Sequence, residues 1–105
     1  MTKALQILGL ARRAGAVAPG TTATRRSISQ GEARVVLMAE DASSTQLDKI
    51  RRTMRKRIIP QVLLGDRATL GAAIGKAPIT AVAVTDASLA GRLLESIDGL
   101  SLIHI

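Results

Sequence analysis

The sequence contains no cysteine, no phenylalanine, tyrosine or tryptophan, and only one histidine. Without cysteine the chain cannot form disulfides, use a thiolate nucleophile or build the common structural zinc sites, and one histidine cannot build a metal cluster. Without aromatic rings it cannot stack bases as readers of single-stranded nucleic acid usually do. We therefore expect no metal, no cofactor and no redox chemistry.

Long hydrophobic runs are also missing, although 47% of the residues are hydrophobic. The longest uncharged apolar stretches, such as residues 77–84, fall well short of the roughly 20 residues that a membrane span needs. The run from Leu5 to Leu10 is too short, and too soon followed by Arg12 and Arg13, for a signal peptide. These features predict a soluble, cytoplasmic protein with no membrane partner; separately, we expect a monomer.

The chain has an excess of positive charge, and the excess lies in its first half. The formal net charge is +7; residues 1–57 contain twelve Lys and Arg against four Asp and Glu, whereas residues 58–105 contain three against four. Charge concentrated in this way favours a polyanionic partner, and nucleic acid is the commonest one in the cytoplasm. A surface that merely keeps the protein soluble is the alternative interpretation.

Short apolar runs alternate with helical patterns along the 105 residues. Strands are predicted at 33–39, 61–64, 79–84 and 100–105. Helices are predicted at about 5–13, 22–30, 45–55 and 67–74, and a last helix is predicted to follow a cap at Asp86 or Ser88 and to end at about 97. Short connections between them favour parallel pairing with crossover helices on both faces. The predicted fold is an α/β, three-layer α/β/α sandwich with a small mixed, largely parallel sheet, in a single domain.

Polar residues before the helices are predicted to cap them, and Pro19 with Gly20 is predicted to break the chain before the second helix. The expected caps are Thr21 or Thr22, Ser43 or Ser44, Asp66, and Asp86 or Ser88.

The domain is assigned to residues 1–97. Residues 98–105 are either a C-terminal strand or a non-native end, because SLIHI resembles translated sequencing-adapter read-through. His104, in this run, is interpreted as an ordinary strand side chain.

The start of the second predicted helix is a candidate anion site. Gly20, Thr21 and Thr22 are uncharged and precede Arg25 and Arg26. Free backbone N–H groups at a helix start attract phosphate, and the arginines would add charge. The alternative is an ordinary capped helix on the surface.

A second candidate is the basic stretch from 49 to 57, in which six of nine residues are Lys or Arg. Ile50 and Met54 are four residues apart and are expected to face inward. A phosphate backbone would neutralise the mutual repulsion of the remaining side chains, whereas the alternative is a solvated helix face. The basic residues are Lys49, Arg51, Arg52, Arg55, Lys56 and Arg57.

Glu40 and Asp41 follow the predicted strand 33–39, at the edge where open α/β sheets bind ligands. A catalytic pair or a metal site must therefore be considered, but no histidine accompanies them, and the motifs GxGxxG and GxxxxGK[ST] are absent. Turn capping, or a place next to RNA, is the favoured interpretation. No catalytic residue is assigned, and the protein is predicted not to be an enzyme.

Five blocks of sequence, in order, resemble the kink-turn RNA-binding ribosomal protein superfamily (L7Ae/L30e-like), most closely its bacterial YlxQ-like branch. The resemblance reaches to about Ile97 and implies RNA, ribosomal or otherwise structured, as the partner, with ribosomal proteins as further neighbours. The blocks are LGLARRAG (8–15), GT (20–21), RVVLMAEDAS (34–43), IPQVLLGDRATLGAAIGK (59–76) and AVAVTDASLAGRLL (81–94).

In that family, the loop entering the second helix carries Gly-Thr-Asn-Glu and, three residues later, a lysine, which together contact the sheared G·A pairs of a kink-turn. Gly20 and Thr21 match this pattern, and Arg26 stands in place of the lysine. Thr22 and Ala23 stand in place of the asparagine and the glutamate. The methyl group of an alanine cannot accept from guanine N–H donors as a carboxylate does.

The resemblance also implies a second contact in the loop before the third strand, where Pro78, Ile79 and Thr80 offer apolar surface to splayed nucleotides. The pair Glu40 and Asp41 matches the family's acidic strand end. We therefore expect a non-enzymatic RNA-binding protein. The alternatives are a protein-interaction adaptor that has lost specific RNA recognition, and the recognition domain of an RNA-modifying enzyme.

Overall fold

A computed structural model describes residues 2–97 and 102–103 of the chain. Within these residues no helix is both long and apolar enough to pass through a membrane. The elements in chain order are α1 (Thr2–Arg13), β1 (Val17–Pro19), α2 (Thr21–Ser29), β2 (Val35–Met38), α3 (Ser44–Thr53), the 3₁₀ turn η1 (Met54–Lys56), β3 (Gln61–Leu63), α4 (Arg67–Ala73), β4 (Ala81–Val84), α5 (Ala87–Ile97) and β5 (Leu102–Ile103).

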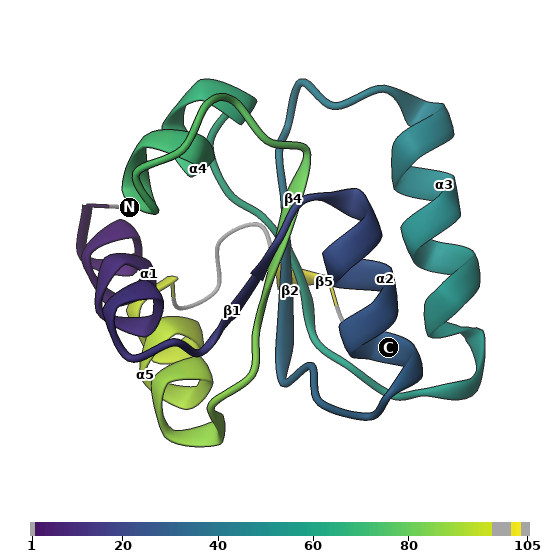
Figure 1. The fold of residues 1–105 in the computed structure, drawn as a ribbon, viewed down its shortest axis with the longest axis horizontal. Coiled ribbons are helices and arrows are strands. Elements are labelled where there is room, and N and C mark those ends of the chain that lie inside the picture. Colours follow the sequence, from purple (N-terminus) through teal and green to yellow (C-terminus); the bar gives the residue numbers. More distant parts are fainter. Residues whose placement is uncertain (1, 98–101, 104–105) are drawn as a thin grey trace.

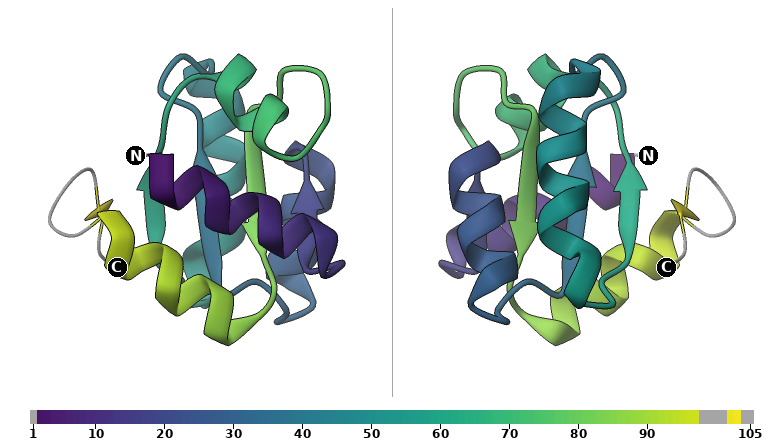
Figure 2. Two further views of the ribbon diagram at one scale, coloured as in Figure 1. Left: turned by 90° about the vertical axis from the view of Figure 1, so that its left-hand side faces the viewer. Right: turned by 90° about the vertical axis from the view of Figure 1, so that its right-hand side faces the viewer.

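Helices cover both faces of a five-stranded sheet, so the molecule has three layers (Figure 1). Helices α1, α4 and α5 lie on one face, and α2 and α3 lie side by side on the other, as the two side views also show (Figure 2). The predicted α/β/α sandwich is therefore confirmed.

The core consists of two aliphatic clusters, one on each side of the sheet. Because strand side chains alternate, Val35 and Leu37 of β2 belong to one cluster, and Val36 and Met38 belong to the other. All residues of β2 and β4 are buried. A strand buried on both faces has a continuous apolar sequence, which is why both strands could be recognised from the sequence.

The strand order is β1-β4-β2-β3-β5, and the sheet is mixed as predicted. However, the expectation of a largely parallel sheet is wrong. Among the strand pairs of the described residues, β2 and β3 are parallel, whereas β1 with β4, β2 with β4, and β3 with β5 are antiparallel.

The short helix α4 explains this direction. Its seven residues span only about 10 Å, and the chain then turns back to the edge where it left β3. The Ile79 N–H, just before β4, donates to the Arg67 carbonyl at the start of α4 over 3.1 Å. Strand β4 therefore begins at the edge of the sheet where β3 ends, on the other side of β2, and runs antiparallel to β2. Helix α3 instead returns across the sheet and makes β3 parallel to β2.

Three strand predictions need correction. Residues 17–19 form the outermost strand β1, which was not predicted; Pro19 pairs with Val82 there, where a missing N–H is tolerated, and the predicted break follows at Gly20. Strand β4 begins at Ala81, so Ile79 and Thr80 lie in the preceding loop. The predicted strand 100–105 is described only as Leu102–Ile103, antiparallel to β3, and His104 lies outside the described residues.

Three of the predicted helix caps are confirmed by hydrogen bonds to backbone N–H groups. Ser43 Oγ accepts from Gln46, and Asp86 Oδ1 accepts from Leu89. Asp66 Oδ1 accepts from the Thr69 N–H over 2.7 Å. Hydrogen bonds from the Thr69 hydroxyl and then from its backbone N–H lower the pKa of Asp66 below its ordinary value of 3.8, because they stabilise the ionised carboxylate.

The cap at Asp66 predicts a pH-dependent contribution to stability. Since the pKa of Asp66 is lowered on folding, its contribution is present above the ordinary value and is lost as the pH falls through the lower folded value. Asp66→Asn should therefore lower the urea midpoint near neutral pH, and the difference from the wild type should shrink as the pH falls below 3.8. If the difference in urea midpoint stayed constant between neutral and acidic pH, the ionised carboxylate of Asp66 would not contribute to stability.

Two helical glycines provide a matched test of how closely α4 packs on the loop that follows it. A Cβ at Gly71 would lie 2.7 Å from the Ala77 carbonyl carbon and 2.9 Å from the Lys76 carbonyl oxygen, whereas a Cβ at Gly91 meets nothing within 4 Å. Gly71→Ala should destabilise the protein by about 1–3 kcal/mol through overpacking. Gly91→Ala should stabilise it by about 0.5–1 kcal/mol, because alanine favours helix. Urea denaturation measures both, and a Gly71→Ala protein as stable as Gly91→Ala would contradict this packing.

Candidate nucleic-acid interface

Three of the predicted segments meet at one edge of the sheet, at the top of Figure 1. The Gly20 N–H, before α2, donates to the Ala81 carbonyl over 2.8 Å, and the Ala39 N–H, after β2, donates to the Thr80 carbonyl over 2.8 Å. The start of β4 thus connects α2 on one side to β2 on the other. We call this surface the α2 edge; it comprises residues 20–26, 39–41, 65–67 and 76–80.

Helix α2 begins differently from the prediction. The N-cap is Gly20, with φ 90° and ψ 164° and no side-chain cap bond, so Thr21 and Thr22 are helical residues rather than caps. A φ in this range favours glycine. The Thr24 N–H makes the first bond of the helix, to the Gly20 carbonyl, which leaves the N–H groups of Thr21, Thr22 and Ala23 without an acceptor in the helix.

The first turn of α2 also contains no acidic residue. Its N–H donors and the positive end of the helix dipole therefore face the surroundings without a nearby carboxylate from the same turn. Such an arrangement favours a phosphate or another anion.

A buried hydroxyl holds this turn in place. Thr24 is fully buried, and its Oγ1 donates to the Ala18 carbonyl of β1 over 3.2 Å. Because Ala18 pairs with Ala83 of β4, the bond fixes the start of α2 relative to the sheet. The orientation of the α2 donors is thus set by the core.

The two arginines of α2 have different surroundings. Arg25 Nε donates to Thr53 Oγ1 over 2.9 Å, which ties α2 to α3. Arg26 is exposed one residue further along. Both side chains are exposed, and the bond to Thr53 is what distinguishes Arg25 from Arg26, which lies in the last turn of α2.

Glu40 and Asp41 also differ. The Asp41 Oδ1 accepts from the Arg67 N–H over 2.8 Å, and its Oδ2 lies 3.5 Å from Arg67 Nε, so Asp41 holds the start of α4. This confirms the turn-capping interpretation for Asp41. Glu40 is exposed, and its backbone N–H donates to the Gly65 carbonyl over 2.8 Å. In the part of the chain that the structure describes, no three His, Cys, Asp or Glu residues form a potential metal site.

The loop before β4 carries Pro78, which is exposed, and Ile79 and Thr80, which are half-buried. Beside this loop, the Arg12 guanidinium packs against Gly75, which has a φ of +68°. A Cβ added at Gly75 would lie only 3.2 Å from that guanidinium. The end of α1 thus packs against the beginning of this loop.

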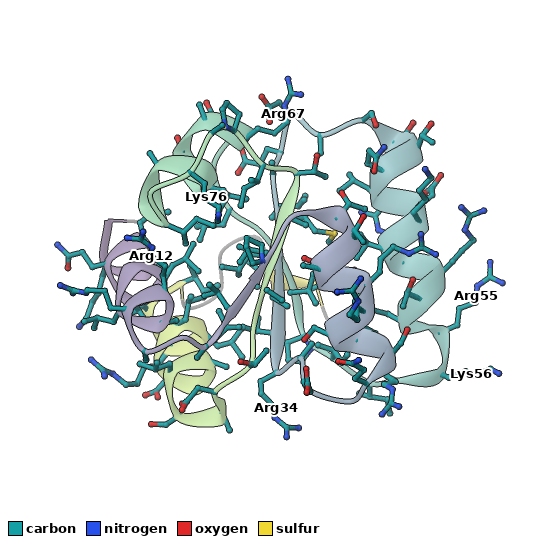
Figure 3. The ribbon with its side chains drawn as sticks, viewed as in Figure 1. Arg12, Arg34, Arg55, Lys56, Arg67 and Lys76 are labelled. Atoms are coloured by element: carbon teal, nitrogen blue, oxygen red, sulfur yellow. The ribbon has the colours of Figure 1, made fainter. Side chains whose placement is uncertain are left out.

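Sequence reasoning did not assign Arg67 and Lys76 to the site, although both belong to the α2 edge (Figure 3). Lys76 could have been assigned from the sequence, because it is two residues before Pro78, which was assigned. Arg67 belongs to the α2 edge because the start of α4 lies beside the end of the loop before β4, where the Ile79 N–H donates to the Arg67 carbonyl. No local sequence pattern indicates this position.

The basic side chains of the stretch 49–57 are not brought to the first turn of α2 or to the loop before β4, although Thr53 in this stretch accepts a bond from Arg25. Helix α3 starts near that edge and runs away from it, so Arg55 and Lys56 project at a distance from Arg67 (Figure 3). Ile50 and Met54 are buried, which confirms the predicted inward stripe. The structure therefore separates the predicted residues into two surfaces.

The chain matches the Ribosomal protein L7Ae/L30e/S12e/Gadd45 family over residues 2–93. It is 37% identical over 92 residues to the RNA-binding protein YlxQ of Bacillus subtilis, and the match covers 88% of this chain and 92% of that protein. The large ribosomal subunit protein eL8 of Thermoplasma volcanium is 29% identical over 96 residues, which cover 90% of this chain and 79% of that protein.

Solved structures show the same fold. A protein of unknown function from Bacillus halodurans C superposes with a TM-score of 0.86 at 31% identity, covering 93% of this chain and 99% of that one. The 15.5kD RNA binding protein of Giardia lamblia superposes with a TM-score of 0.75 at 18% identity, covering 95% and 85%, and supports the fold alone. The family match and the identity to YlxQ confirm the resemblance inferred from the sequence: the chain belongs to the ribosomal protein L7Ae/L30e/S12e/Gadd45 family.

Proposed function

We propose that this chain is a non-enzymatic RNA-binding protein, a monomer of the cytoplasm, that contacts ribosomal or other structured RNA through the α2 edge. The observation that carries the proposal is the position of the first turn of α2. Its donors lie beside the loop before β4, because Gly20 donates to Ala81. The family match and the name of the Bacillus subtilis relative support RNA as the ligand.

Each part of the edge has a chemical role in this proposal. The N–H groups of the first α2 turn and the hydroxyls of Thr21 and Thr22 donate to phosphate and sugar oxygens, and Arg26 supplies charge. Pro78 and Ile79 offer apolar surface on which a splayed nucleotide can rest. Since the chain has no aromatic residue, recognition would depend on backbone and shape rather than on stacking.

A kink-turn is the RNA shape that we propose for this edge. Gly20, Thr21 and Arg26 stand at the positions that the family pattern assigns to kink-turn contact. Thr22 and Ala23 lack the amide and carboxylate acceptors of that pattern, so we propose weaker discrimination between a kink-turn and a plain duplex. Ribosomal proteins would be neighbours in the assembled particle.

Arg26→Ala tests the contribution of charge at this edge. Loss of one phosphate contact should weaken binding to all RNAs similarly and reduce the slope of log affinity against log salt by about 1. Filter binding at several salt concentrations measures both quantities. Arg92→Ala is the matched control, because Arg92 is an exposed cation on α5, across the sheet from α2. Equal behaviour of the two variants would argue against an RNA contact at Arg26.

The double change Thr22→Asn with Ala23→Glu tests recognition of shape. A restored carboxylate can accept from guanine, and a hydrogen bond to a charged group contributes about 1.5–3 kcal/mol. The preference for a kink-turn over an unkinked duplex of equal length should therefore rise about tenfold or more. An unaltered preference would mean that these positions do not read the RNA.

The adaptor function is the second candidate, because Ala23 has no side-chain acceptor and Thr22 lacks the amide of the family pattern. Cross-linking in cells separates the two functions. Recovery of RNA with the protein supports our proposal, whereas consistent protein partners without RNA would support the adaptor.

A further inference from the structure

The end of α3 and the turn η1 form a dense cationic surface away from the α2 edge. Ile50 and Met54 anchor this segment, with 0% and 5% of their surface exposed. Five basic side chains around them are exposed: Arg51, Arg52, Arg55, Lys56 and Arg57. Asp48 is the acidic residue of α3, and its Oδ1 lies 3.9 Å from Arg51 NH1.

Helix stability alone does not account for so many cations. A cation in the last turn of a helix contributes about 0.3–1 kcal/mol through the helix dipole. Arg51 and Arg52 occupy that turn in α3. The cations beyond them add mutual repulsion, and a single exposed ion pair such as Asp48 with Arg51 compensates little of it. A polyanion would remove the repulsion.

Two arginines join this surface to α2. Arg25 Nε donates to Thr53 Oγ1 over 2.9 Å, and Arg57 NH2 donates to the Ser29 carbonyl over 3.0 Å. The Arg57 guanidinium also lies over Gly31, where a Cβ would be 2.9 Å from its NH1 atom. Arg25 and Arg57 thus position the two helices against each other, while Arg51, Arg52 and Arg55 surround a shallow hollow with Asp48.

Although Arg25 in the middle of α2 bonds to Thr53, the first turn of α2 and the cations at the end of α3 are electrostatically separate, because α3 starts near the α2 edge and carries its cations at its far end. Helix α3 has ten residues and is about 15 Å long, whereas charges in physiological salt are screened over about 8 Å. An RNA held at the α2 edge therefore has to extend along α3 to reach these cations. A base-paired segment presents its phosphates outward, and the chain has no Phe, Tyr or Trp to stack the bases of a single strand.

We infer that the outer face of α3 and η1 is a second RNA-binding surface, which holds the phosphate backbone of a base-paired segment flanking the RNA at the α2 edge. This inference rests on the proposed function. The ligand class is the duplex backbone, independent of sequence. Arg51, Arg52 and Arg55 are the phosphate contacts, and Arg25 and Arg57 are positioning residues.

The test compares two RNAs: a kink-turn with a short helical arm, and the same kink-turn with that arm extended by one helical turn. The variant is Arg51→Gln with Arg52→Gln and Arg55→Gln. The matched control, Lys3→Gln with Arg13→Gln and Arg92→Gln, removes the same charge from α1 and α5. Circular dichroism checks that both proteins fold, and affinity is measured at several salt concentrations.

The wild type and the control should bind the extended RNA at least about tenfold more tightly than the short one at low salt. The α3 variant should bind both RNAs equally, and its salt slope for the extended RNA should fall by up to about 2.7, or about 0.9 for each lost contact. Binding of the short RNA should remain within a few-fold of the wild type.

Three results would overturn the inference while leaving the proposed function intact: an α3 variant that keeps the full gain for the extended RNA, a wild type that binds both RNAs equally, or a control that loses the gain as completely as the α3 variant. A wild type that binds neither RNA would overturn both proposals.

Discussion

The structure depends on the antiparallel insertion of β4 between β1 and β2. All four residues of β4 are buried, and they contribute to both aliphatic clusters of the core. At its start, the Ala81 carbonyl accepts from Gly20, and the neighbouring Thr80 carbonyl accepts from Ala39. These two bonds place the beginning of α2 and the end of β2 on either side of the loop before β4. A strand running in the opposite direction would carry that loop to the other end of the sheet.

The α2 edge is consequently built from backbone held by the core. Gly20 supplies the conformation that turns β1 into α2, and the buried Thr24 hydroxyl fixes the first turn against β1. N–H donors positioned by the core do not need to be ordered when a ligand binds, which lowers the entropic cost of recognition. In our proposal the cations on α3 have a complementary role, because they attract the phosphate backbone of the RNA without recognising its shape. Separate surfaces for shape and for charge suit a small basic protein without aromatic rings.

Local patterns in the sequence were sufficient for features set by neighbouring residues. The cap at Asp66 and the inward positions of Ile50 and Met54 depend on one turn of helix, and both were predicted. The direction of β4 was not, because it follows from the shortness of α4 and the return of the chain to the same edge. The cap at Gly20 was missed because the threonines after it have the side chains that usually cap helices. The bond from Arg25 to α3 joins residues 28 apart and has no local signature.

The central claim is that the first turn of α2 and the loop before β4 bind one RNA together. An NMR titration of the ¹⁵N-labelled protein with a kink-turn RNA tests it most directly, since each backbone amide reports separately. The account predicts that the amides of Thr21, Thr22 and Ala23 shift together with those of Ile79 and Thr80, at the same RNA concentration, while those of α5 do not. Shifts on α5 without shifts at the start of α2 would contradict it.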